Sequence, residues 1–183
     1  MDARELLAMM CPHGIQVGMP FGGVPQLTAL DIAGAIGMSN MTDLQSYLLR
    51  VKYAMDFGCY DKLRYRWMAR VVDHAVHEGW KAQKGTPRIL PMAIFTLIEH
   101  LGWNTCPRCH GAAHAIVGDV KQVCPTCDGT GKQYRSERWI ADKVLDIHHS
   151  TFQQTWRDRF NWCRGNLSQI EENAVRKLRS RVG

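Results

Sequence analysis

The sequence predicts a mainly α-helical protein with a small four-cysteine module inserted between its helices. Outside residues 104–132, apolar residues recur at three- and four-residue intervals, which is the spacing of one buried helix face. Inside that range, two C-x-x-C motifs flank a short segment of alternating apolar and polar residues, a pattern typical of a metal-binding hairpin. A third pattern, at residues 137–164, predicts a helix-turn-helix.

The N-terminal part predicts a short helix, an irregular arm and then longer helices. Residues Arg4–Met10 are expected to be helical, and the glycines and prolines that follow, through Pro25, predict an irregular arm. A helical pattern then begins at Thr28 and is interrupted at Gly37. A longer helix is expected from about Thr42 to a stop near Gly58.

Two central helices follow, one with a basic strip and one almost without charge. Asp61–Glu78 predicts a helix with an inward face and an outward basic strip, the former made of Leu63, Trp67, Val71 and Ala75 and the latter of Lys62, Arg66 and Arg70. Leu90–Leu101 is apolar around most of its circumference, so it is expected to be the buried centre of the fold. After the module, helix resumes near Ser136, a suitable N-cap, and continues in pieces to Arg181.

The module at residues 104–132 predicts a structural zinc site. Its candidate ligands are Cys106, Cys109, Cys124 and Cys127. Each C-x-x-C is followed two residues later by a glycine, Gly111 or Gly129, which can adopt positive φ and close a tight turn. Two such turns present four thiolates to one Zn²⁺ and leave no position for water. Between them, Ala113–Val117 and Val120–Val123 predict a hairpin.

Two disulfides are the alternative interpretation of these cysteines. The first residues include two acidic side chains and no apolar core of signal-peptide length, so secretion is not expected. The odd total of seven cysteines also favours a reducing compartment such as the cytoplasm. Cys11, Cys59 and Cys163 are expected to be buried apolar residues without chemistry.

Charge is distributed unevenly along the chain. Residues 1–49 carry one basic and four acidic side chains, residues 50–84 carry eight and four, and residues 132–183 carry eleven and six. Basic segments beside a zinc module indicate a polyanionic partner, most simply nucleic acid, although a solvated basic surface is the alternative. No apolar run approaches the ~18 residues of a membrane span, so no membrane partner is expected.

The stretch from Trp139 to Phe160 has the pattern of a DNA-reading helix-turn-helix. Its inward residues are expected to be Ile140, Ala141, Val144 and Leu145 in the first helix, Ile147 in the turn, and Phe152, Trp156 and Phe160 in a second helix that starts at Ser150 or Thr151. The outward residues at the start of the second helix are then the candidate DNA contacts: His149, Ser150, Gln153, Gln154 and Arg157. Such side chains pair with base edges or phosphates in the major groove. The alternative is a plain helical hairpin, and Asp146 stands in the turn where glycine is more comfortable.

Nothing in the sequence predicts an enzyme. The chain contains no G-x-S-x-G, no phosphate-binding loop and no H-E-x-x-H. His74 and His77 stand three residues apart on a predicted helix. No further ligand set accompanies them, so they are interpreted as a solvated or core-edge pair rather than as a metal site.

The order of these elements resembles the lambda-type Q antitermination proteins of phages and prophages. The resemblance rests on the segment D-I-A-G-A-I-G-M-S at residues 31–39, the paired C-x-x-C-x-G knuckles and the helix-turn-helix that follows them. It implies that Cys106, Cys109, Cys124 and Cys127 bind one zinc ion. The knuckles also resemble those of J-protein zinc modules, but the chain has neither further knuckles nor a His-Pro-Asp motif.

The resemblance implies a function in transcription. Such proteins bind a DNA element overlapping a promoter, load onto a paused, sigma-containing RNA polymerase and promote read-through of pauses and terminators. The implied partners are double-stranded DNA, bacterial RNA polymerase with sigma factor and a Nus-type elongation factor, in the cytoplasm of a bacterial host. Residues 1–60 are then expected to contact polymerase and residues 61–183 to form the helical DNA-binding region. The alternative is a zinc-containing helix-turn-helix repressor or activator that stays on its promoter.

Overall fold

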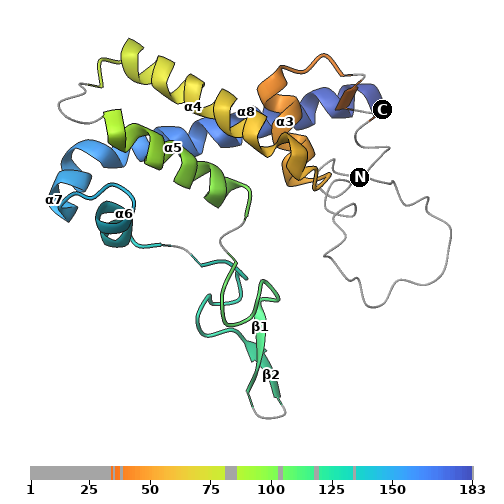
Figure 1. The fold of residues 1–183 in the computed structure, drawn as a ribbon. Coiled ribbons are helices and arrows are strands. Elements are labelled where there is room, and N and C mark those ends of the chain that lie inside the picture. The colour runs from red at the N-terminus through yellow and green to blue at the C-terminus, as the bar shows by residue number, and fades with distance from the viewer. Residues whose placement is uncertain are drawn as a thin grey trace, which may run out of the picture. The chain divides into compact units, whose positions relative to one another are not determined.

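Helices form most of the structure, and the two strands form a single hairpin (Figure 1). The computed structural model describes residues 39–80, 86–102, 105–117, 120–133 and 135–182, together with Gly34, Ile36 and Gly37. In chain order, the elements are α3 (Asp43–Lys52), the 3₁₀ turn η1 (Phe57–Cys59), α4 (Tyr60–His77), α5 (Thr86–His100), β1 (His114–Val117), β2 (Val120–Val123), α6 (Glu137–Lys143), α7 (His149–Thr151), the π-helical turn η2 (Phe152–Trp156) and α8 (Arg157–Val182). The predicted helix at Arg4–Met10 and the arm after it lie outside the described residues.

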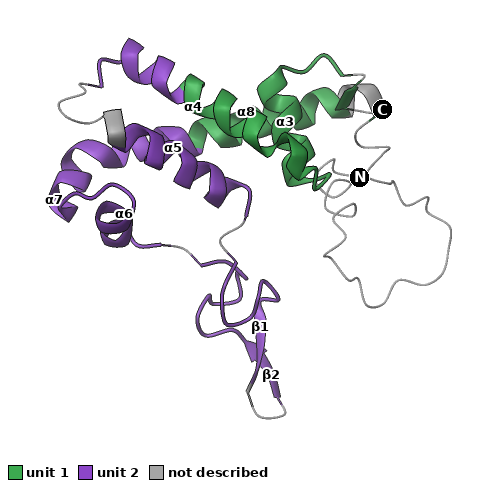
Figure 2. Ribbon diagram, in the orientation of Figure 1, with its two compact units in different colours: residues 1–70, 165–183 green, residues 71–164 purple. Residues whose placement is uncertain are grey.

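The chain divides into two compact units (Figure 2). Unit 1 comprises Met1–Arg70 and Gly165–Gly183, and unit 2 comprises Val71–Arg164. The boundary therefore falls inside α4 and inside α8. The sequence prediction divided the chain differently, into residues 1–60 and residues 61–183, because each region was expected to contact a different partner. The compact units do not test this division, so it stays a prediction.

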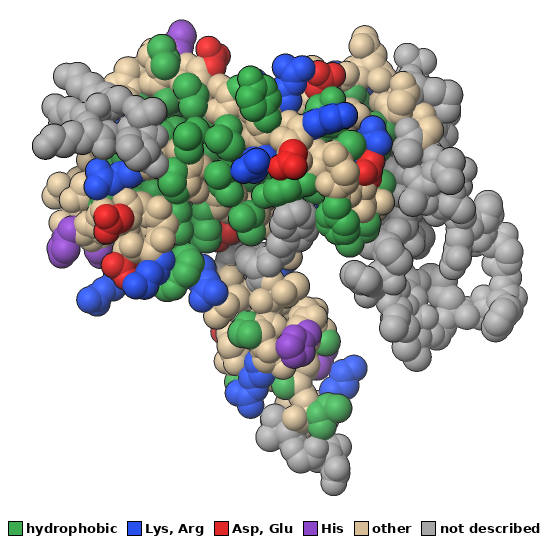
Figure 3. Space-filling model, in the orientation of Figure 1, with side chains coloured by type: hydrophobic (Ala, Val, Ile, Leu, Met, Phe, Trp, Pro, Cys, Tyr) green, Lys and Arg blue, Asp and Glu red, His purple; other side chains and the backbone are tan. Residues whose placement is uncertain are grey.

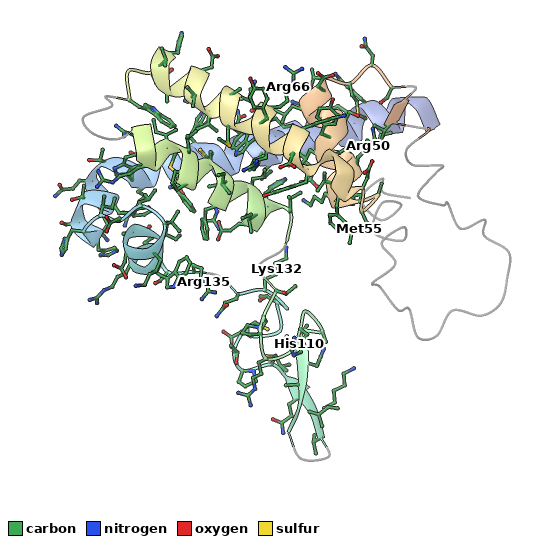
Figure 4. All side chains as sticks on the ribbon, viewed as in Figure 1. Arg50, Met55, Arg66, His110, Lys132 and Arg135 are labelled. Carbon is green, nitrogen blue, oxygen red and sulfur yellow. The ribbon has the colours of Figure 1, made fainter. Side chains whose placement is uncertain are left out.

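In unit 1, the start of α3 follows the sequence prediction, but its end does not. Thr42 forms a capping box with Gln45, in which each side chain accepts a hydrogen bond from the other residue's backbone N–H. The predicted stop near Gly58 is wrong, because α3 ends at Lys52. Met55 adopts a positive φ of 54°, which no helix accommodates. This bend at Met55 (Figure 4) lies between Arg50 and Asp56, which are joined by an ion pair.

Unit 1 is held together by apolar contacts between α3 and the last part of α8. Leu49 packs in one cluster with residues of the α8 segment Ala174–Leu178. Beside this cluster, the carboxylate of Glu171 accepts hydrogen bonds from Lys52 Nζ at 2.6 Å and from the Tyr53 hydroxyl. The carboxylate is nearly buried and has two donors, as a buried charge requires.

The inward and outward faces of α4 agree with the sequence prediction. Its buried residues include Leu63, Trp67, Val71 and Ala75. The basic strip of Lys62, Arg66 and Arg70 is exposed. Two of its members have partners within unit 1, since Arg66 (labelled in Figure 4) pairs with Asp43 at 2.7 Å and Arg70 donates to Asn166 at 2.8 Å.

In unit 2, α5 is the buried helix that its composition predicts. It begins at Thr86, four residues before the predicted start, and no residue from Arg88 to Leu101 is classed as exposed. Near its end, the side chain of Glu99 is only 7% exposed and lies 3.4 Å from Arg164. Burial raises the pKa of this carboxyl. Within the described part of the chain, no helix is both long and apolar enough to cross a membrane.

Candidate metal centre and helical hairpin

Four cysteine side chains meet in the module between α5 and α6. The sulfur atoms of Cys106 and Cys124 are 3.9 Å apart, and those of Cys109 and Cys127 are 3.6 Å apart. All four sulfurs lie within 4.8 Å of one another, and the side chains are at most 7% exposed. A tetrahedral site with metal–sulfur bonds of about 2.3 Å places its sulfurs ~3.8 Å apart. The cluster therefore has the dimensions to hold one metal ion.

The alternative of two disulfides does not describe this arrangement. All four cysteines are free thiols, and their sulfur separations are far longer than the ~2.05 Å of a disulfide bond. Among the residues that the structure describes, they are also the single group of three or more His, Cys, Asp or Glu side chains arranged to hold a metal.

Two equivalent turns present the sulfurs. After each second cysteine, two successive residues have positive φ: His110 at 48° and Gly111 at 89° in one turn, Asp128 at 47° and Gly129 at 77° in the other. The prediction that both glycines adopt this conformation is confirmed. In the first turn, the His110 N–H donates to the carbonyl of Cys106 at 2.8 Å. Each turn thus folds its own C-x-x-C back on itself.

The two knuckles close on each other through Gly131. Its φ is 69°, and a Cβ at this position would lie only 2.6 Å from the carbonyl oxygen of Gly111. The Cys106 N–H donates to the Gly131 carbonyl at 2.9 Å, and the Gly131 N–H donates to the sulfur of Cys127 at 3.3 Å. Lys132, the next residue, forms an isolated antiparallel β-bridge with Thr105. Only glycine fits where the two turns approach this closely.

The thiols of the cluster differ in acidity because their surroundings differ. Burial, together with a hydrogen bond to Cys127, raises the pKa of Cys109 to about 11. Burial also acts to raise the pKa of Cys124, but hydrogen bonds from the backbone of Thr126 and from Cys127 outweigh it and lower this pKa to about 7. The thiolate is the form that binds a metal. Cys124 therefore supplies a thiolate more readily than Cys109 does, and a bound cation would favour ionisation of Cys109.

The hairpin between the knuckles has almost no apolar core. β1 and β2 pair antiparallel, with Ile116 opposite Lys121. Ile116 is 80% exposed, and Val120 and Val123 are 58% and 59% exposed, so basic and apolar side chains share its surface (Figure 3). Among the partly buried apolar residues that the structure describes, Ala115 alone packs against the cysteine cluster. Apolar burial therefore contributes little to this module, and the cysteines form its centre.

The region 137–164 forms a helical hairpin with the predicted inward face. Ser136 caps α6, its hydroxyl accepting from the Trp139 N–H at 3.2 Å. The buried residues are Ile140 and Ala141 of α6, Leu145 in the turn after it, and Phe152, Trp156 and Phe160 of the second helix. Leu145 was predicted to belong to the first helix, but α6 ends at Lys143. Val144 and Ile147 are half-buried. The second helix starts at His149, slightly earlier than predicted, and α7, η2 and α8 follow one another without a loop to Val182.

The turn of this hairpin has a feature that the sequence analysis found and one that it missed. Asp146, the residue noted as standing in place of glycine, has a φ of 50°. Aspartate is among the few residues that tolerate this conformation. Arg88 of α5, which the sequence analysis did not assign to the site, donates to the carbonyls of Leu145 at 2.9 Å and Asp146 at 3.2 Å. Its guanidinium thereby holds the turn in place.

Three of the five candidate DNA contacts gather around one carboxylate, Glu137. Arg157 donates through Nε at 2.8 Å and Nη2 at 2.6 Å, one bond to each carboxylate oxygen. His149 Nε2 lies 3.8 Å from the same group, and the side chain of Gln153 also acts to lower the pKa of Glu137. Arg157 holds the pKa of Glu137 below its usual value, and Glu137 raises the pKa of Arg157.

The other two candidates project elsewhere, and Glu137 itself was missed by the sequence analysis. Ser150 and Gln154 are exposed, and the Ser150 hydroxyl lies 2.8 Å from Nδ1 of His148, the residue that caps α7. In the sequence, Glu137 stood out only because it follows Ser136, the residue predicted to cap the helix. Its contact with Arg157 joins residues 20 positions apart, which no local spacing indicates.

The histidine pair of α4 is engaged with neighbours. His74 stacks on Trp162 with ring centroids 3.6 Å apart, and Trp80 meets both rings edge-on. His77 is exposed and lies 3.2 Å from a carboxylate oxygen of Glu78. His74 therefore lies at the edge of the core, and His77 is a solvated residue.

No protein-family model matches this chain, and no curated protein matches it at a significant level. The resemblance to lambda-type Q proteins therefore rests on the order of the motifs alone.

Proposed function

We propose that this protein is a transcription antitermination factor that binds a promoter-overlapping DNA element and then travels with RNA polymerase. The observation that carries the proposal is the cysteine cluster followed directly by a helical hairpin whose second helix begins with outward polar side chains. In the lambda-type Q proteins that the sequence resembles, a paired-knuckle module precedes the DNA-reading element in the same order.

The metal in this proposal is one structural Zn²⁺. Four thiols at the separations reported above suit zinc, which favours sulfur ligands and tetrahedral geometry. Four protein ligands complete that geometry, so the ion would stabilise the module and would not bind a substrate. For this reason, and because the sequence carries none of the catalytic motifs sought above, we propose a role without catalysis.

DNA recognition in this proposal has an electrostatic part and a reading part. Basic side chains attract DNA and release counterions, a contribution that declines steeply as salt rises. The exposed side chains of Ser150, Gln153 and Gln154 then meet base edges as the start of the second helix enters the major groove. His149 and Arg157 complete the set, held beside Glu137.

Substitutions within the second helix test the reading part. Gln153→Ala and Arg157→Ala should each weaken binding to the preferred DNA by about tenfold to a hundredfold if they reach a base edge. Thr155→Ala, an exposed residue of the same turn, is the matched control and should bind as the wild type does. If both substitutions leave binding unchanged while Lys62→Ala or Arg66→Ala abolishes it, the DNA-reading surface lies on α4 instead.

Travel with polymerase is the part of the proposal that separates it from an ordinary promoter-bound regulator. Residues 1–49 are acidic overall and poorly suited to DNA, so we assign polymerase contacts to residues 1–60. Deleting residues 1–25 should leave DNA binding largely intact and abolish terminator read-through by purified bacterial polymerase holoenzyme. A truncated protein that still carries polymerase past the terminator would contradict this assignment.

The ordinary regulator remains the second candidate and has its own signature. Such a protein would protect promoter DNA in a footprinting experiment and change initiation, but full-length protein would leave termination unaltered. Both readouts come from one transcription template that contains the protected DNA and a downstream terminator. A Nus-type elongation factor, the further partner in the proposal, is added in a separate reaction to measure its effect on read-through.

A further inference from the structure

We infer that Glu137 of α6 determines the specificity of the DNA-reading helix. Its carboxylate holds Arg157 ready for a base and discourages Arg157 from binding phosphate. The inference rests on the proposed function, because it requires the start of the second helix to face DNA. It concerns a residue on α6, outside the set of side chains that reach the DNA themselves.

The hydrogen-bond geometry of Arg157 leaves one edge of its guanidinium open. Its Nε and Nη2 atoms donate to the two oxygens of Glu137 at 2.8 Å and 2.6 Å. A guanidinium has five N–H donors in one plane, so both N–H groups of Nη1 and one of Nη2 stay outside this pair. These donors form the end of the group, which matches the O6 and N7 acceptors of guanine. Arg157 can therefore reach a base while it remains paired with Glu137.

The charges around Arg157 weaken its attraction for phosphate. The formal charges of Arg157 and Glu137 cancel each other, and the negative charge of Asp158 also acts to raise the pKa of the guanidinium. A phosphate that approaches Arg157 meets the Glu137 carboxylate beside it, and like charges at short range repel. Guanine carries no net charge and meets no such repulsion. The pair thus favours a base edge over a backbone phosphate.

The same carboxylate also lies beside the neighbouring reading side chains. Gln153 acts to lower the pKa of Glu137, and His149 Nε2 lies 3.8 Å from the carboxylate. His149, Gln153 and Arg157 recur at four-residue intervals along the second helix, so one acceptor spans two turns of its outward face. Side chains held in place before binding lose less conformational freedom when they contact DNA.

Partial exposure makes this role separable from stability. The side chains of Arg157 and Glu137 are each 41% exposed. Ion pairs this close to solvent contribute little to folding, so removing the pair should leave the protein folded. The guanidinium is also accessible enough to meet DNA without rearrangement of the hairpin.

The test uses a library of synthetic DNA duplexes with a randomised central segment. Wild-type protein first selects its preferred sequences. Affinities for a selected duplex and for the unselected library are then measured over a series of salt concentrations. The variants are Glu137→Gln, Glu137→Asp, Arg157→Ala and Asp142→Asn. Asp142 lies on the same helix and pairs with Lys143 at 3.1 Å, so Asp142→Asn makes the same change of charge away from Arg157.

Glu137→Gln should bind the unselected library about threefold to tenfold more tightly, with a salt dependence steeper by about one ion. Its preference for the selected duplex should fall about tenfold. Asp142→Asn should keep the wild-type preference. Glu137→Asp keeps the negative charge and should therefore bind the unselected library as weakly as the wild-type protein does. If Glu137→Gln does not fold, this variant still tests the inference.

The outcomes distinguish this inference from the proposed function. If Glu137→Gln changes the preference no more than Asp142→Asn does, while Arg157→Ala destroys it, the inference is wrong and the DNA-reading helix stands. If the wild-type protein selects no sequence at all, the proposed DNA-reading function itself is wrong. A Glu137→Asp variant that shows the same lowered preference as Glu137→Gln, although it binds the unselected library as weakly as the wild-type protein does, would also overturn the inference.

Discussion

The cysteine module and the helical hairpin that follows it are stabilised in opposite ways. In the module, the buried centre is four sulfur atoms, and large apolar side chains such as Ile116 stand in solvent. In the hairpin, the buried centre is apolar, with Phe152 and Leu145 at most 1% exposed. The module presents ligands around a site for an ion, whereas the hairpin buries apolar surface.

This difference predicts which conditions each region depends on. A centre of thiolates requires a cation to hold it together, so the module should respond to chelators. An apolar centre gains its free energy from the removal of surface from water, so the hairpin should not respond to chelators directly.

Loss of a metal ligand should have the largest effect. Cys124→Ser, or chelation of the wild-type protein, should abolish metal binding and the ordered structure of residues 105–133, because ligation and local folding are coupled. Elemental analysis measures the bound zinc, and hydrogen exchange measures the structure. Gln122→Ala, at an exposed site on β2, is the control inside the module. Folded protein that contains no zinc and exchanges slowly throughout the module would contradict the prediction.

Phe152→Ala should destabilise the hairpin and spare the metal site. Phe152 is fully buried, and truncation of a buried phenylalanine costs about 3–5 kcal/mol of unfolding free energy. Chemical denaturation measures the loss, with Gln154→Ala as the control at an exposed position two residues away, expected to change stability by no more than about 0.5 kcal/mol. Zinc content in the folded protein should not change. Loss of zinc together with stability would show that the two regions fold as one.

Gly131→Ala should weaken the module through its backbone. An alanine Cβ would lie 2.6 Å from the Gly111 carbonyl oxygen, and a non-glycine residue with positive φ adds about 1–3 kcal/mol of strain. Zinc affinity, measured by competition with a chelator, should fall. Gly111→Ala is the matched comparison, since its nearest contact would be 3.7 Å away and it carries the backbone strain alone. Equal losses of zinc affinity in the two variants would show that the close approach of residue 131 to the Gly111 carbonyl adds nothing to the backbone strain.

The parts of the fold that sequence patterns predicted are those determined by neighbouring residues. The two knuckles, their glycines and the caps at Thr42 and Ser136 each depend on a few consecutive positions. The inward faces of α4 and of the hairpin helices follow from regular spacing in the same way. Local chemistry therefore predicted all four members of the cysteine cluster, because each C-x-x-C builds its own turn.

The parts that the sequence did not predict depend on contacts between distant positions or on tertiary context. Arg88 reaches the hairpin turn 57 residues away, and Arg157 reaches Glu137 at a separation of 20. The early end of α3 accompanies the left-handed conformation of Met55, a residue with no local preference for it. Alternation predicted the strands of the module, but it did not predict that their apolar residues would be exposed.

Asp146→Gly should give a small gain in stability at the hairpin turn. The φ of 50° at this position suits glycine, and relief of strain outweighs the greater freedom of glycine in the unfolded chain, for a net gain of at most about 1 kcal/mol. Asp142→Gly is the opposite control, since it places glycine inside α6 and should cost a few tenths of a kcal/mol or more. A loss of stability in Asp146→Gly would mean that the aspartate side chain itself holds the turn.

The smallest effect on stability should come from the ion pair between Glu137 and Arg157. Because Arg157 lowers the pKa of Glu137 below its ordinary 4.5, the pair's contribution is present at neutral pH. It is lost as the pH falls below about 4.5 and the carboxyl is protonated. Thermal unfolding of the wild type and of Glu137→Gln should therefore differ by only about a degree or two at pH 7, and the difference should vanish in acid. A Glu137→Gln variant that lost as much stability as Phe152→Ala would place Glu137 among the residues that build the hairpin. Its effect on DNA preference could then no longer be separated from folding.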